Sequence, residues 1–223
     1  AMARFILGGR RAAGKVGVVS LFCVLTSASA WAANPAGTAT LAEEGQGEAK
    51  RLVLENDFLR AVIAPSIGAR VESLVLKSLG REVTVAPADG VRWGLLSDQL
   101  WQQDFWHSDW NRNPYQVLPV EKGPDRARVI FVGKGRLWEG VTLRKMVTLE
   151  ARRAALDVEY TLTSSPSAHA RGAGDLWIHN ALPAGARVFL PSESGVLERP
   201  LTIEPETNVF NPTHGWIAGV MEG

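Results

Sequence analysis

Aromatic and polar side chains alternate densely over residues 95–115, the stretch LLSDQLWQQDFWHSDWNRNPY. Sugars present apolar C–H faces rimmed by hydroxyl groups, so flat aromatic rings beside amide, carboxylate and guanidinium groups suit them as ligands. This composition predicts a sugar or glycan as the partner of the protein. The residues expected to contact the sugar are Trp101, Trp106, His107, Asp109, Trp110 and Arg112.

Two other interpretations of this stretch remain open. A long loop needs a small core of its own, so the tryptophans could anchor the loop over a sheet, with some rings buried and Trp106 or Trp110 facing outward. A metal could in principle bind Asp104, His107 and Asp109, but their spacing matches no specific metal-binding signature. We therefore expect no metal and no other cofactor.

Period-two patterning predicts the elements that must position these groups. Over 156–163, for example, apolar residues alternate with Asp157, Glu159 and Thr161. No stretch after the N-terminal region shows convincing helical periodicity, so the expected fold class is all-β, an antiparallel β-sandwich. The expected strands are 52–54, 58–64, 70–77, 116–121, 128–132, 141–150, 156–163, 176–181 and 188–190.

Residues 1–32 have the features of a secretory signal peptide. Basic residues precede an uncharged apolar run over 16–25, and Ala30-Trp31-Ala32 fits a small-x-small cleavage site. The run is shorter than the roughly 20 residues of a membrane-spanning helix. We therefore expect a periplasmic or secreted protein with no stable membrane insertion after cleavage. Residues 33–50, rich in small and charged residues, are expected to be a flexible lead-in to one domain over 51–223.

Composition argues against several other classes of protein. Without residues 1–32, 20 basic residues stand against 23 acidic ones, and no Lys/Arg cluster suggests a nucleic-acid-binding face. Cys23 is the one cysteine and lies in the leader, so the mature chain has no disulfide and no cysteine nucleophile. A serine-triad hydrolase lacks support because no G-x-S-x-G motif occurs.

Two segments share their order of motifs with one family. Residues 51–85 follow the order strand, Glu-Asn-Asp, strand, P-x-x-G-x-R, strand, Gly-Arg-Glu. Residues 138–181 give two alternating strands, a loop with Ser165-Pro166, and the strand segment Leu-Trp-Ile-His-Asn over 176–180. Over 51–181 the chain thus resembles galactose mutarotase-like proteins, the aldose 1-epimerases and their β-supersandwich relatives. The resemblance implies a supersandwich fold and a sugar substrate.

The resemblance also implies roles for single residues. In mutarotases a strand histidine protonates the ring oxygen while a carboxylate takes the proton of the anomeric hydroxyl, and the ring opens and recloses as the other anomer. His179 matches the position of that acid, and Asn180 is an expected sugar-binding residue. The alternative for His179 is a half-buried strand histidine that hydrogen-bonds a neighbour.

No glutamate matches the family's late-strand base, and residues 211–220 read as a loop entering a strand. We therefore expect a domain truncated at its C-terminus. Two functions stay open. One is an exported aldose 1-epimerase-like isomerase with His179 as general acid. The other is a non-catalytic carbohydrate-binding module of a polysaccharide-processing or glucan-assembly protein.

Overall fold

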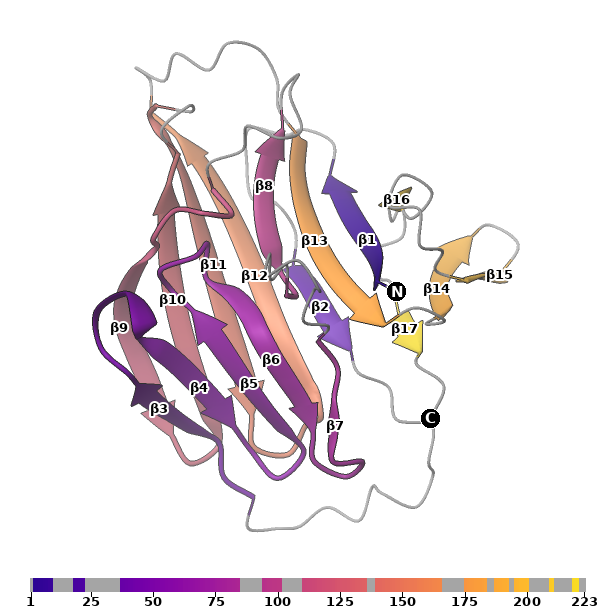
Figure 1. Cartoon of the computed structure of the whole chain (residues 1–223), viewed down its shortest axis with the longest axis horizontal. Coiled ribbons are helices and arrows are strands. Elements are labelled where there is room, and N and C mark those ends of the chain that lie inside the picture. The colour runs from indigo at the N-terminus through magenta and orange to yellow at the C-terminus, as the bar shows by residue number, and fades with distance from the viewer. Residues whose placement is uncertain are drawn as a thin grey trace.

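The chain folds into β-sheets that are antiparallel apart from one short strand pair, which confirms the all-β, antiparallel class (Figure 1). The computed structural model describes residues 2–9, 18–22, 37–84, 94–101, 110–135, 139–165, 175–183, 187–192, 195–200, 209–210 and 218–220. Within these ranges there is no α-helix, and the one helical turn is the 3-10 segment η1 (Gly47–Ala49).

Two five-stranded sheets form the body of the sandwich, and Figure 1 shows one lying in front of the other. The front one, here called the meander sheet, runs in sequence order through β3 (Thr40–Glu44), β4 (Arg51–Glu55), β5 (Leu59–Ala64), β6 (Arg70–Leu76) and β7 (Arg81–Glu82). The second, the long-strand sheet, has the order β2 (Val18–Phe22), β12 (Ala155–Ser164), β11 (Val141–Glu150), β10 (Arg126–Lys134) and β9 (Gln116–Gly123).

Two smaller sheets complete the described part of the fold. The histidine sheet has the order β16 (Val209–Phe210), β1 (Met2–Gly9), β13 (Asp175–Pro183) and β8 (Ser97–Trp101). Its β1 and β16 are the parallel pair. A three-stranded sheet has the order β15 (Gly195–Pro200), β14 (Arg187–Ser192) and β17 (Ala218–Val220).

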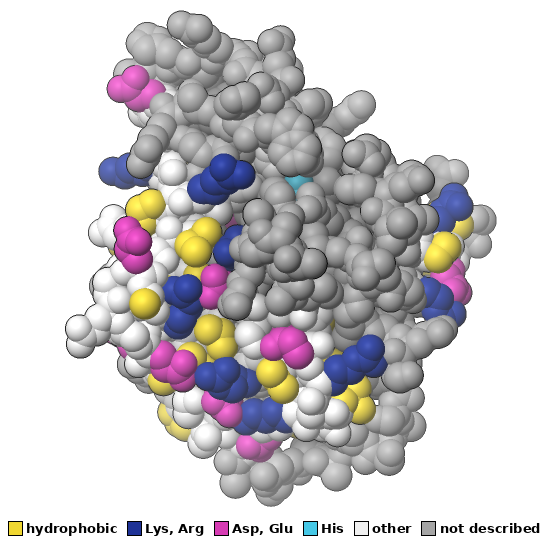
Figure 2. All heavy atoms as spheres, viewed as in Figure 1, with side chains coloured by type: hydrophobic (Ala, Val, Ile, Leu, Met, Phe, Trp, Pro, Cys, Tyr) yellow, Lys and Arg dark blue, Asp and Glu magenta, His cyan; other side chains and the backbone are white. Residues whose placement is uncertain are grey.

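The core is filled by the inward-facing apolar side chains of the alternating segments predicted from the sequence. In β10 and most of β11 buried and partly exposed residues alternate, and the buried apolar side chains join a single cluster with side chains of the meander sheet, such as Leu54 and Ile63. The meander sheet carries ion pairs between its strands and turns, including Arg51–Glu72 and Lys77–Glu55, each with 2.6 Å between nitrogen and oxygen. Figure 2 shows charged side chains of both signs interspersed over this side of the molecule.

The predicted turn after β4 also ties the two large sheets together. Asn56 is buried, and its Oδ1 accepts hydrogen bonds from the backbone N–H groups of Phe58 and Leu59, at 2.9 and 2.8 Å. Its Nδ2 donates at 2.8 Å each to the backbone carbonyls of Glu150, at the end of β11, and of Arg153, in the turn before β12. One side chain thus closes one turn and fixes its distance to another.

The N-terminal part differs from the expectation of a flexible lead-in over 33–50. Residues 40–44 form β3, which pairs with β4 from Thr40↔Glu55 to Glu44↔Arg51. Ala39 and Leu41 are buried in the core, because apolar residues alternate here as well. Further upstream, β1 pairs with β13 and β2 with β12. Cleavage of residues 1–32 remains a prediction, and it would remove both of these strands from their sheets.

Candidate functional site

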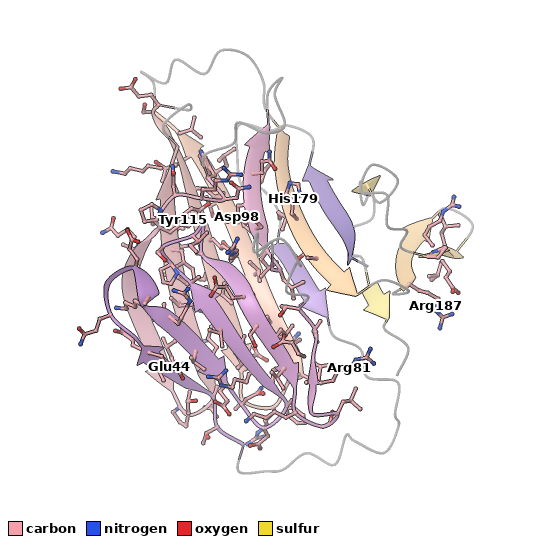
Figure 3. All side chains as sticks on the ribbon, viewed as in Figure 1. Glu44, Arg81, Asp98, Tyr115, His179 and Arg187 are labelled. Atoms are coloured by element: carbon pink, nitrogen blue, oxygen red, sulfur yellow. The ribbon has the colours of Figure 1, made fainter. Side chains whose placement is uncertain are left out.

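His179 lies in the middle of β13, between β8 and β1 (Figure 3). Its Cα is in register with that of Ser97 on β8. Residues paired in this way, and residues two apart on one strand, point to the same face of a sheet. Ser97, Gln99 and His179 therefore share one face, here called the site face, and their exposed fractions are 1%, 2% and 1%.

The opposite face of the same two strands points into the core. Asp98 is in register with Ile178, and both are buried. Asn180 is also fully buried, and its Oδ1 accepts a hydrogen bond of 2.9 Å from the backbone N–H of Leu96. Consecutive residues of a strand point to opposite faces, so His179 and the adjacent Asn180 do not line one site. The expected sugar-binding residue Asn180 instead braces the start of β8.

A kinked segment leads into β8 and links the histidine sheet to the meander sheet. Gly94 and Leu96 both have left-handed φ angles, of 62° and 56°. Between them, Leu95 exchanges two backbone hydrogen bonds of 2.9 Å with Val71 on β6. The carbonyl of Gly94 accepts a further bond of 2.9 Å from the N–H of Ala181 on β13. The segment is thus bonded to a strand on either side.

A fully buried lysine from the long-strand sheet holds this segment from within the core. Lys145 Nζ donates to the carbonyl of Leu96 at 2.5 Å and to Asp98 Oδ1 and Oδ2 at 3.2 and 3.1 Å. Both charged side chains have an exposed fraction of 0%. Two tyrosine hydroxyls complete the group, Tyr160 donating to Asp98 Oδ1 at 2.8 Å and Tyr115 to Asp98 Oδ2 at 3.2 Å. We call these four side chains the buried network.

Burial changes the proton affinities within the buried network. It raises the pKa of Asp98, although Lys145 and the two tyrosine hydroxyls act to lower it. Burial lowers the pKa of Lys145, although Asp98 acts to raise it. The pKa of Tyr160 lies well above its ordinary value because of burial and the negative charge of Asp98. Since the pKa values of acid and base move toward each other, the charged and neutral forms of the pair are closer in free energy than in water.

The predicted aromatic stretch ends in the core rather than at the surface. Trp110 has an exposed fraction of 1% and belongs to the apolar cluster. Its backbone packs on the turn before β6, where a Cβ on Gly68 would lie 2.9 Å from the carbonyl oxygen of Trp110. Of the two interpretations of this ring, the structure favours the anchoring one. The ring therefore packs as a core side chain, whereas Arg112 is exposed, and a sugar contact at either residue stays a prediction.

The remaining predicted contacts fall partly or wholly outside the described residues. The backbone of Trp101 ends β8 in register with Asp175, and its side chain is not described. Trp106, His107 and Asp109 lie outside the described residues. Their proposed contact with a sugar stays a prediction.

Three groups that surround or support His179 were not predicted from the sequence, namely Ser97, Gln99 and Lys145. A signal existed for Lys145. It stands between Leu143 and Val147 at an inward position of the alternating segment 141–150, where a lysine must find a buried partner. Ser97 and Gln99 stood in the stretch read as a loop, and nothing local marked them as strand residues.

The described part of the chain holds neither a group of metal ligands nor a membrane-spanning helix. No three His, Cys, Asp or Glu side chains there are grouped closely enough to hold a metal ion. The same residues contain no helix with the length and apolar character needed to cross a membrane.

Comparison with known proteins gives weak structural similarity alone. No family model matches the chain, and no curated protein matches it. Among solved structures, a TPR-domain containing protein from Parabacteroides distasonis ATCC 8503 is similar with a TM-score of 0.45 and 15% sequence identity. The alignment covers 91% of this chain and 37% of that protein. The chain therefore spans a little over a third of the length of that neighbour.

Proposed function

We propose that this chain is an exported carbohydrate-binding protein of the galactose mutarotase-like kind, with its sugar site on the site face. The observation that supports the proposal is the placement of Ser97, Gln99 and His179 on one face of two paired strands. A hydroxyl, a carboxamide and an imidazole can each both donate and accept hydrogen bonds, as sugar hydroxyls require. With β1 of the predicted leader in place the three side chains are almost fully buried, so a ligand must displace other parts of the chain to reach them.

The position of Asp98 favours binding over catalysis as the main activity. Among the described side chains Asp98 is the only buried carboxylate, and mutarotation needs a carboxylate facing the acid. Asp98 points away from the site face and is bonded to Lys145, so it does not serve as that base. An isomerase would need a carboxylate other than Asp98 on the site face.

The experiment that tests the proposal is a glycan array followed by polarimetry on the sugars that bind. We expect at least one mono- or oligosaccharide to bind the wild-type chain, and the His179→Asn variant to bind it more weakly. An exposed turn substitution, Asp57→Asn, serves as the control and should leave binding unchanged.

Polarimetry then separates the two candidate functions. For a catalytic His179, anomer interconversion should fall by about 10²–10⁴-fold in the His179→Asn variant, the usual contribution of a positioned proton donor. Binding without any interconversion by the wild type would identify a non-catalytic module. A chain that binds no sugar on the array would refute the proposal.

A further inference from the structure

Lys145 of the buried network bonds to two residues at the start of β8, Leu96 directly before the strand and Asp98 within it. Lys145 Nζ donates to the backbone of Leu96 and to the side chain of Asp98, two positions further on. Tyr160 lies in β12, and Tyr115 directly precedes β9. Their hydroxyls donate to the two oxygens of the same carboxylate, that of Asp98. Figure 3 shows Tyr115 and Asp98 next to each other, with His179 farther along on the neighbouring strand.

Because the side chain of Asp98 is held toward the core, the direction of its neighbours' side chains follows. Side chains alternate along a strand, so Ser97 and Gln99 must face the other way, where His179 lies. A slip of one residue would exchange the two faces. It would turn Asp98 onto the site face and bring Ser97 or Gln99 into the apolar core.

The backbone at Leu96 requires such support. Its φ of 56° is left-handed, a conformation that costs a non-glycine residue energy and persists only where the surroundings enforce it. Here the N–H donates to Asn180 Oδ1 and the carbonyl accepts from Lys145. Both polar groups of the strained residue are thus held by fully buried side chains.

We propose that Lys145 is a positioning residue that fixes the register of β8 against β13 and thereby sets Ser97 and Gln99 beside His179. A buried ion pair contributes little net stability compared with apolar residues of similar size, because desolvating two charges offsets their attraction. Its distinctive effect is to penalise every arrangement that separates the two charges. The inference rests on the proposed function only for the use made of this face, since the register itself involves no sugar.

The test reads the register by a disulfide that forms only when positions 97 and 179 face each other. Cysteines are placed at both positions, as Ser97→Cys and His179→Cys, in the full chain with Cys23→Ser. Facing residues of antiparallel strands have Cα atoms about 4.5–5.5 Å apart, which suits a disulfide. With the network intact we expect oxidation to link the two cysteines almost completely, as measured by peptide mapping with mass spectrometry.

The partners of Asp98 are then replaced together by apolar residues. The apolar variant carries Lys145→Met, Tyr115→Phe and Tyr160→Phe, so that Asp98 keeps its carboxylate and loses these three side-chain partners. Because an unpartnered carboxylate in the core is costly and a slip of β8 would move Asp98 to the site face, we expect this variant to keep a β-type circular dichroism spectrum and a cooperative melt but to lose most of the 97–179 disulfide. The matched control, Glu55→Leu with Lys77→Met, removes an exposed ion pair of the meander sheet and should keep the disulfide.

Three results would overturn the inference. One is an apolar variant that folds and still forms the disulfide as completely as the parent. Another is an apolar variant that does not fold, because the network would then supply stability rather than register. The third is a parent that forms no such disulfide at all. A chain that behaves as expected here but binds no sugar would refute the proposed function and leave the role of Lys145 intact.

Discussion

At the scale of single residues, the contact between Tyr115 and Asp98 depends on the absence of a side chain at Gly133 in the neighbouring strand β10. Gly133 lies in β10, and a Cβ at that position would come within 2.5 Å of the Tyr115 ring. The glycine therefore leaves the space in which the ring lies, and the ring carries the hydroxyl to Asp98. In this way a residue with no functional group supports the buried network.

Substituting Gly133 with alanine should destabilise the protein by about 1–3 kcal/mol, because the added methyl group overpacks the core against a ring that has no free space. The measurement is the urea midpoint of unfolding at constant slope. Gly123→Ala is the matched control, since its Cβ would meet nothing closer than 3.8 Å, and its effect should stay within about 0.5 kcal/mol. Equal effects of the two substitutions would contradict this account of Tyr115.

The sequence allowed some of these residues to be predicted and not others. His179 was placed in a strand by its apolar neighbours and by resemblance, and the structure confirms the strand. The pairing of His179 with Ser97 could not be predicted, because register depends on contacts between strands 82 positions apart in sequence. Strand alternation, which the sequence already contained, separates Asn180 from His179 onto opposite faces, and the sugar contact of Asn180 stays a prediction.

At the scale of elements, residues 94–96 are the link that carries β8 from the meander sheet to β13. Gly94 has a left-handed φ of 62°, and a Cβ there would lie 2.2 Å from the carbonyl oxygen of Val71. The close approach is what allows Leu95 to exchange two hydrogen bonds with Val71. The position of the site face thus depends on Gly94, the glycine of this link.

Gly94→Ala should therefore lower the free energy of unfolding by more than the penalty for a left-handed alanine alone. The left-handed conformation costs an alanine about 1–2 kcal/mol, and the clash adds an overpacking term of about 1–3 kcal/mol. Gly80→Ala is the control, because Gly80 has a similar φ of 57° with nothing within 4 Å of its Cβ. Thermal melts of both variants check this, and a Gly94 variant no less stable than the Gly80 variant would show that the link can adjust.

Strands could be predicted where apolar residues alternate with polar ones along the segment. All nine segments predicted from apolar alternation correspond to strands, from β4 to β14. β8 was missed because it runs through Ser97, Asp98 and Gln99, which are polar on both faces. Its inward carboxylate is satisfied by Lys145 from another sheet, and no local pattern can reveal such a partner.

At the scale of the whole molecule, the sandwich acts as a support for a small polar face. The meander sheet and the long-strand sheet enclose the apolar core, and Lys145 passes from the latter to the strand beside His179. The all-β class followed from the sequence, because period-two alternation extends over most of residues 51–190. The arrangement of four sheets did not, since it depends on non-local pairing.

The central claim is that a sugar binds beside His179, and the most direct test is the NMR signal of its imidazole. In ¹⁵N-labelled protein the ring resonances of His179 are those that disappear in the His179→Asn variant. Adding a sugar that binds on the array should shift these resonances progressively and saturably, while the rings of the other histidines serve as internal references. Saturating sugar that shifts other signals and leaves the His179 ring unchanged would contradict the proposed site.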